Sequence, residues 1–214
     1  MSTSIETSDF STPLRGVMPV VSDSFLEWRR STGAGQWDEM WEGVLHMAPS
    51  PNRSHQDFEG WLEFWLRMHW VPRFGGRVYH QINVTPSADN WRKNYRVPDL
   101  VLLTPDRFHI DHNEFFCGPP AAVVEIHSLG DESYDKLPFY FSLGEPEVWI
   151  AARDTWRMEV FTRGEQEFVT QPAAADGWLR SPALGVEFLS QPANRLAVRL
   201  TGEDATREEF STAR

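Results

Sequence analysis

The sequence predicts a single α/β domain in which helices flank a mixed, twisted central sheet. Four short apolar segments, each suited to a buried strand, lie between residues 77 and 152, with a helical segment between the third and the fourth. A strand, a helix and a strand within about thirty residues are typical of the βαβ unit of such sheets. A chain of 214 residues is also long enough to bury about 70% of the surface that its unfolded state exposes.

The elements before this sheet are expected to be short, except for one helix. Residues 1–24 are polar and rich in Ser and Thr, which predicts a flexible segment before a domain spanning residues 25–201. A short helix is expected over 25–28 and a strand over 41–47. The longest helix is expected over 55–70, because apolar side chains recur there at spacings of three and four and form one stripe. These side chains are Phe58, Trp61, Leu62, Trp65, Leu66 and Met68.

The remaining elements follow from apolar runs and turn residues. The four strand candidates span residues 77–84, 100–104, 121–127 and 148–152. A helix is expected over 134–143, because its proline stands in an early turn, where proline is tolerated, and a glycine follows its last residue. Strands over 157–162 and 167–170 are predicted to form a hairpin. The charged residues 202–214 predict a frayed C-terminal tail.

Composition limits the possible classes of function. The single cysteine, Cys117, excludes an intrachain disulfide and a cysteine-based zinc cluster. Apolar runs are too short to span a membrane and the polar start lacks the apolar core of a signal peptide, so we expect a cytoplasmic protein. The net charge of −11 argues against tight, non-specific binding of nucleic acid. Proteins that neutralise phosphates are normally basic on at least one face, so any such contact would need a local basic patch.

Two acidic residues stand beside apolar strands. Asp99 precedes the run 100–103, and Glu125 follows the run 122–124. Asp and Glu are seldom buried unless they are paired or bind a metal. Mg²⁺ prefers oxygen ligands and usually takes one or two carboxylates from the protein. The pair therefore predicts a divalent-cation site, with a simple turn acid after proline as the alternative for Asp99.

A basic stretch immediately precedes Asp99. Its cations are Arg92, Lys93 and Arg96, and they alternate with Trp91 and Tyr95. Aromatic rings can stack on unpaired bases, and cations can contact phosphates. The stretch is therefore a candidate contact for nucleic acid, and a solvated hairpin turn is the alternative.

A series of short motifs occurs in a fixed order between residues 37 and 168. They are Glu42-Gly43, Pro49-Ser50 with His55-Gln56, Pro98-Asp99, Glu125-Ile126-His127-Ser128, Lys136 with Tyr140, and Glu147-Val148-Trp149. This order resembles the Uma family of restriction-endonuclease-like proteins, which are members of the PD-(D/E)xK nuclease superfamily. The resemblance implies a restriction-endonuclease-like fold, with a mixed central sheet flanked by helices.

The chemistry implied by the resemblance is Mg²⁺- or Mn²⁺-dependent hydrolysis of phosphodiester bonds in DNA. Asp99 and Glu125 would bind the metal, with the backbone carbonyl of Ile126 as a third ligand, and the metal would activate a water. A lysine would hold that water and stabilise the developing negative charge. Because His127 occupies the usual position of this lysine, Lys136 on the following helix is the expected substitute. His127 is an alternative base, since an unperturbed histidine titrates near pH 6.5.

Further assignments stay open at this point. Glu42 is a candidate third acid near the metal, and His55 is a candidate for steadying the site; purely structural roles are the alternative for both. Lys136 also fits a solvated helix position, and His127 fits a satisfied histidine at a strand end. A homodimer would suit cleavage of both strands of a duplex.

Two other functions compete with a nuclease. One is a nuclease-fold protein that has lost catalysis and acts as a binding or assembly module, which His127 at the lysine position supports. The other is a sheet protein of another class, in which the acids form surface pairs with arginines. Such exposed pairs contribute only about 0–1 kcal/mol, so loss of either acid would then change stability little.

Overall fold

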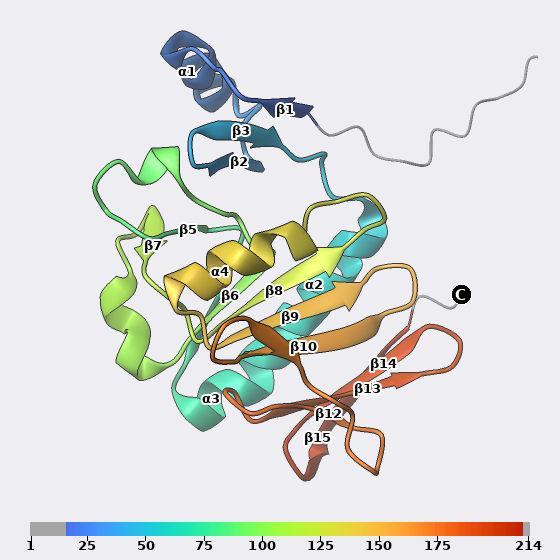
Figure 1. Ribbon diagram of the computed structural model, residues 1–214. Coiled ribbons are helices and arrows are strands. Elements are labelled where there is room, and N and C mark those ends of the chain that lie inside the picture. The colour runs from blue at the N-terminus through green and yellow to red at the C-terminus, as the bar shows by residue number, and fades with distance from the viewer. Residues whose placement is uncertain (1–15, 212–214) are drawn as a thin grey trace, which may run out of the picture.

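The computed structural model describes residues 16–211, and a six-stranded mixed sheet lies at its centre (Figure 1). Its strands run in the order β11-β10-β9-β8-β6-β4. They are β4 (Arg77–His80), β6 (Leu100–Leu103), β8 (Ala122–His127), β9 (Glu147–Ala152), β10 (Arg157–Arg163) and β11 (Phe168–Thr170). β8 and β9 are parallel, and the other neighbouring pairs are antiparallel. The predicted mixed α/β class, the βαβ unit and the hairpin are confirmed.

The pairing of β6 with β8 decides where the two predicted acids lie. The strands are antiparallel, and Leu100, the first residue of β6, pairs with Val124. Asp99 precedes Leu100, and Glu125 follows Val124. The two acids therefore meet at one edge of the sheet, although they are far apart in the sequence.

Each face of the sheet is covered by its own apolar core. One face packs against α2 (Arg53–Trp65) and a second sheet, and its cluster includes Phe58, Trp65 and Trp149. The other face packs against α4 (Leu137–Leu143), whose Phe139 and Tyr140 are buried. Alternate residues of each strand supply the two cores, as expected for a sheet that is covered on both sides.

The long predicted helix is a continuous helical segment of three parts. α2 is followed by a π-helical turn (Leu66–Trp70) and then by α3 (Val71–Phe74). The side chain of Asn52 accepts a hydrogen bond from the backbone N–H of His55 at 3.0 Å and caps the start of α2. This cap fixes the first turn of the helix, from which His55 extends to the site described below.

The N-terminal elements are better ordered than the sequence predicts. A three-stranded sheet contains β1 (Gly16–Met18), β2 (Asp38–Trp41) and β3 (Val44–Met47), and α1 (Asp23–Thr32) lies beside it (Figure 1). The strand expected over 41–47 is a hairpin, with its turn at Glu42-Gly43. Of the predicted flexible segment 1–24, residues 1–15 lie outside the described residues. For 16–24 the prediction is corrected, because β1 pairs with β3 and α1 begins at Asp23.

The C-terminal region forms a second sheet that the sequence did not suggest. Its strands are β12 (Leu179–Ser181), β13 (Val186–Gln191), β14 (Arg195–Leu200) and β15 (Glu203–Ser211). The prediction of a frayed tail from residue 202 is wrong as far as residue 211. β15 pairs with β14, and the ring of Phe210 packs at 5.2 Å from Phe58 and at 5.0 Å from Trp156. The single domain over 25–201 remains a prediction.

Shorter elements complete the described chain. β5 (Asn83–Thr85) and β7 (Phe115–Cys117) form a two-stranded parallel sheet. Short 3-10 helices span Trp91–Lys93, Pro105–Ile110 and Tyr134–Lys136. Between residues 16 and 211, no helix has both the length and the apolar composition needed to cross a membrane.

Glu145, just after α4, is a buried acid that gives a direct test of the packing. It is completely buried, and neither of its carboxylate oxygens has a hydrogen-bond partner among the described residues. Burial raises the pKa of Glu145 well above its ordinary value, and the charge of Arg107 opposes the rise. We expect Glu145→Met to raise the free energy of unfolding by about 1–3 kcal/mol at pH 8, because it removes an unsatisfied polar group.

The gain in the free energy of unfolding of Glu145→Met should be smaller at acid pH. A carboxyl group whose pKa is raised by folding binds more protons in the folded state than in the unfolded state. The stability that it contributes is therefore present at low pH and is lost as the pH rises above the pKa of the unfolded state. Urea unfolding at pH 5 and pH 8 measures both effects, and the exposed Glu165→Met is the matched control. A Glu145→Met variant less stable than wild type at pH 8 would contradict this account.

Candidate active site

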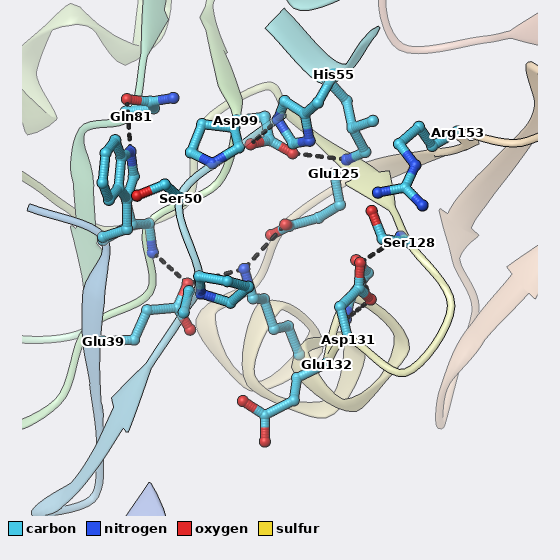
Figure 2. Close-up of a pocket in the computed structure, with 18 of the residues that line it drawn as sticks. Glu39, Ser50, His55, Gln81, Asp99, Glu125, Ser128, Asp131, Glu132 and Arg153 are labelled. Carbon is cyan, nitrogen blue, oxygen red and sulfur yellow. Dashed lines mark hydrogen bonds and ion pairs between the residues drawn. The ribbon is translucent and has the colours of Figure 1, made fainter. Parts of the chain in front are cut away.

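A cavity of about 350 Å³ lies at the sheet edge where β6 begins and β8 ends (Figure 2). Its walls come from β2, from the loop that leads into α2, and from the loop 128–133 that follows β8. Asp99, Glu125, Lys136 and His55 all line it, so the fold brings four of the predicted site residues together. Ile126 lines it as well.

Asp99 is held from two sides. Its Oδ2 accepts a hydrogen bond from the backbone N–H of Ile126 at 2.6 Å, and its Oδ1 lies 2.9 Å from Nε2 of His55 (Figure 2). Since a carboxylate only accepts, Nε2 of His55 donates. Burial lowers the pKa of His55, but the hydrogen bond and the negative charges of Asp99, Glu59 and Glu125 outweigh it and raise the pKa overall. The carboxylate of Asp99 is thereby fixed between β8 and α2.

Glu125 belongs to a buried network of charges. Its Oε2 lies 2.9 Å from Nζ of Lys136, and its Oε1 accepts a hydrogen bond from the hydroxyl of Tyr140 at 2.5 Å. Nζ of Lys136 also lies 2.8 Å from Oε1 of Glu39, so the ammonium bridges two carboxylates. The side chains of Lys136, Glu39 and Glu125 are 11%, 6% and 4% exposed. Water therefore screens this network little.

The environment raises the pKa of both Glu125 and Lys136, for different reasons. Burial raises the pKa of Glu125, and the adjacent ammonium of Lys136 opposes the rise. Burial lowers the pKa of Lys136, but the charges of Glu125 and Glu39 outweigh it and raise the pKa above its ordinary value. Lys136 is consequently a cation at neutral pH.

Glu39 holds the position that the sequence analysis gave to Glu42. Oε1 of Glu39 accepts from the backbone N–H of Val97 at 2.8 Å, and Oε2 accepts from Nε1 of Trp41 at 2.7 Å. Glu42 lies at the β2–β3 turn with a positive φ of 46°, and its side chain is 68% exposed and does not line the cavity. The expectation of a third acid from Glu42 is therefore corrected, and Glu39 is the residue that the fold supplies.

His127 lies outside the cavity lining. Its Nδ1 is 2.7 Å from Oδ1 of Asp131, and its ring meets that of Tyr134 edge to face at 4.8 Å. These contacts match the alternative of a satisfied histidine at a strand end. They also hold the loop that carries Asp131 against the end of β8.

The predicted basic contact is not a continuous surface. The guanidinium of Arg96 is buried between the rings of Trp41 and Phe139, at 4.3 Å and 4.1 Å, and donates to the carbonyl of Met40. The prediction that Arg96 contacts nucleic acid is therefore wrong, because its guanidinium is buried and makes its contacts within the protein. Arg92 and Lys93 are exposed on a 3-10 turn, and Arg92 lines a different cavity.

Arg153 is a cavity residue that the sequence analysis did not identify. It directly follows β9, whose carboxyl end lies beside that of the parallel strand β8. Figure 2 shows its guanidinium pointing toward the cavity, near Ser128. The carboxyl ends of parallel strands are a common place for ligand sites, which is the signal that could have identified it.

Two groups of residues at this edge have the composition of a cation site. Asp99 and Glu125 offer carboxylate oxygens to the cavity, which Ile126 also lines. His55, Glu59 and Asp99 form a second group, and one ligand atom from each lies within 4.8 Å of the others. Glu59 was not anticipated from the sequence, although it follows His55 by one helical turn.

Comparison with known proteins agrees with this architecture. The family model Uma2, described as "Putative restriction endonuclease", matches residues 23–198. A solved structure described as "a putative nuclease belonging to DUF820 from Anabaena variabilis" superposes with a TM-score of 0.54 at 18% sequence identity. The match covers 69% of this chain and 82% of that chain, and at this identity it shows a shared fold. No curated protein matches the sequence significantly.

Proposed function

Because the chain belongs to the Uma2 family of restriction-endonuclease-like proteins, we propose that it is a Mg²⁺- or Mn²⁺-dependent endonuclease that hydrolyses phosphodiester bonds of DNA. The observation that carries the proposal is the convergence of Asp99, Glu125 and Lys136 on one cavity from two strands and the start of a helix. A pair of carboxylates with an adjacent ammonium is what metal-assisted phosphoryl chemistry requires.

The donor atoms fit Mg²⁺ or Mn²⁺. Asp99 and Glu125 offer carboxylate oxygens, and each such oxygen has more than one lone pair, so the existing hydrogen bonds do not exhaust them. The N–H of Ile126 faces Asp99. Because the N–H and C=O of one strand residue point to the same side, we expect the carbonyl of Ile126 to face the same space. When bound, the cation would lower the pKa of an attacking water and offset charge on the phosphate.

Lys136 has an electrostatic role in this proposal. Its raised pKa keeps it protonated, so it donates hydrogen bonds and does not act as a base. Glu39 holds the ammonium in place at 2.8 Å while Glu125 shares it. Lys136 would then position the attacking water and stabilise the negative charge that develops on the phosphate.

Arg153 is proposed to contact the phosphate backbone of the substrate. With Arg153→Ala we expect the KM for DNA to rise about 10-fold with little change in kcat, because one charged hydrogen bond is worth about 1.5 kcal/mol. Steady-state cleavage of a labelled duplex measures both constants. Arg195→Ala is the matched control, since Arg195 is exposed on β14 and does not line this cavity. Equal effects of the two substitutions on KM would exclude Arg153 as a specific contact of the substrate.

The proposed function is tested by incubating the protein with supercoiled plasmid, linear duplex DNA, single-stranded DNA and RNA. We expect DNA cleavage with Mg²⁺ or Mn²⁺ and none with EDTA. Metal binding without cleavage of any substrate would favour the alternative, a nuclease-fold binding or assembly module. Sedimentation of the intact protein tests whether it forms the homodimer that suits cleavage of both strands.

A further inference from the structure

Trp37 differs from the other tryptophans of the chain in what its ring contacts. The sequence contains ten tryptophans, and every one except Trp37 pairs with another aromatic ring or with an arginine guanidinium. Trp91, for example, stacks on the ring of Phe115 at 4.9 Å. Within residues 16–211 the ring of Trp37 makes neither kind of contact, and it is half-buried in the lining of the cavity. Trp37 thus presents an aromatic surface that the protein core does not use.

A neighbouring residue, Gln81, fixes Trp37 beside the acids of the proposed metal site. Nε1 of Trp37 donates to Oε1 of Gln81 at 3.2 Å (Figure 2). The backbone N–H of the same Gln81 donates to the carbonyl oxygen of Asp99 at 3.1 Å. Gln81 has a positive φ of 50°, which few residues other than glycine adopt, so the surrounding structure holds it there. The indole therefore has a fixed orientation, and a single residue connects it to Asp99.

The cavity has an apolar side around Trp37. Its apolar lining comes from the residue before β2, from the loop between β3 and α2, and from the segment that precedes β6. These residues are Trp37, Ala48, Pro49, Pro51 and Val97. Figure 2 shows Gln81 on this side and Arg153 on the opposite side, with Glu125 between them. Divalent cations take oxygen ligands, so an apolar wall suits a different part of the substrate.

The size and chemistry of the cavity suit one nucleotide. Pockets that enclose small ligands have volumes of about 300–1,000 Å³, and this cavity, at about 350 Å³, lies at the lower end of that range. Every nucleobase has a face that stacks on an aromatic ring. In a duplex the neighbouring bases cover this face, so only an unpaired or extruded nucleotide can present it to Trp37.

We propose that the cavity binds one unpaired nucleotide of DNA, with its base stacked on Trp37 and its phosphate beside Asp99 and Glu125. Arg153, on the opposite side, contacts the phosphate backbone beyond this nucleotide. The chain should therefore bind a single strand more tightly than a fully paired duplex. The place of the phosphate and the choice of DNA rest on the proposed function, whereas the stacking of an unpaired base on Trp37 does not.

The experiment measures the affinity of the full chain for a short fluorescent DNA strand by anisotropy, with Ca²⁺ in place of Mg²⁺ to slow cleavage. An abasic strand of the same length and charge is the matched ligand. We expect the wild type to bind the strand with bases about 10-fold more tightly, which is typical of one base stacked on an aromatic ring. Trp37→Ala should bind both strands equally. Trp28→Ala is the matched control and should keep the 10-fold difference, because Trp28 is exposed on α1 and does not line the cavity.

Two further substitutions of Trp37 separate stacking from a purely structural role. Trp37→Leu covers the case in which Trp37→Ala does not fold, because leucine fills more of the space left by the indole. It should also bind both strands equally. Trp37→Phe keeps an aromatic ring but loses the hydrogen bond to Gln81, and it should retain most of the difference between the strands. Thermal melting checks that each variant is folded.

The strands also distinguish this proposal from the proposed function. The stacking site is overturned if the wild type binds both strands equally, if the folded alanine and leucine variants of Trp37 still prefer the strand with bases, or if a paired duplex binds more tightly than the single strand. Tighter binding of an RNA strand of the same sequence would overturn the choice of DNA. Base-dependent binding through Trp37 without cleavage in Mg²⁺ or Mn²⁺ would contradict the proposed function and leave the stacking site in place. Cleavage without base-dependent binding would do the reverse.

Discussion

Glu125→Gln is expected to lower the rate of DNA hydrolysis by at least about 100-fold, since it removes a charged metal ligand and leaves the shape of the side chain unchanged. The fold should tolerate the change. Lys136 keeps Glu39 at 2.8 Å as its partner, and the hydroxyl of Tyr140 can still donate to the amide oxygen. Plasmid cleavage under single-turnover conditions with Mg²⁺ measures the loss of activity.

Glu42→Gln is the matched control for this prediction. Glu42 is an acid of the same motif series, but its side chain is exposed at the β2–β3 turn. The Glu42→Gln variant should cleave DNA at the same rate as the wild type. Near-wild-type activity of a folded Glu125→Gln variant would exclude Glu125 as a metal ligand.

Lys136→Met is expected to reduce the free energy of unfolding by about 3–5 kcal/mol at pH 8, because it leaves two buried carboxylates without their cation. The carboxylates are those of Glu39 and Glu125, each within 2.9 Å of the missing ammonium. At pH 5 the loss should be smaller. Burial raises the pKa of Glu125, and the variant lacks the ammonium that opposes this rise, so Glu125 stabilises the fold at low pH and loses this effect as the pH rises.

A double variant separates this effect from the loss of packing. Adding Glu39→Gln to Lys136→Met removes one of the two charges and should recover part of the stability at pH 8. Urea unfolding of wild type and both variants at pH 5 and pH 8 gives the comparison. A loss of less than about 1 kcal/mol in the free energy of unfolding would be typical of an exposed ion pair. It would contradict the description of Lys136, Glu39 and Glu125 as a buried network.

The sequence predicted the centre of the fold well because the signals there are local. The runs Leu100–Leu103 and Ala122–His127 are apolar and short, as buried strands require, and α2 carries a clear apolar stripe. The last strand of the second sheet, β15 (Glu203–Ser211), was missed because it is rich in charged residues. Its packing depends on Phe210, and only the tertiary structure brings that ring to Phe58.

In the candidate site, the acidic residues at strand ends could be predicted from the sequence, whereas the positions of residues at turns could not. Asp99 and Glu125 were identified because each adjoins an apolar run. Glu42 was chosen over Glu39 because the expected strand began three residues too late, and the hairpin turn directs Glu42 to solvent. Arg96 looked exposed from its charge, but two aromatic rings enclose it, and sequence spacing gives no sign of that.

The acidic charge of the cavity fits a cation-dependent function. Its lining includes acidic residues at five positions, against the cations Lys136 and Arg153. These acids are Glu39, Asp99, Glu125, Asp131 and Glu132. A phosphate group would be repelled from such a cavity unless divalent cations offset the charge. Part of the net charge of −11, which argued against nucleic acid in the sequence, therefore lies where the proposed metals would bind.

The most direct test of the metal-dependent site is calorimetric titration of metal-stripped wild type and Asp99→Asn with Mg²⁺ and Mn²⁺. We expect the wild type to bind both metals. Asp99→Asn should lose binding while staying folded, because Asp99 contributes to every cation site proposed for this cavity. No uptake by the wild type at millimolar metal, or unchanged uptake by Asp99→Asn, would contradict the account.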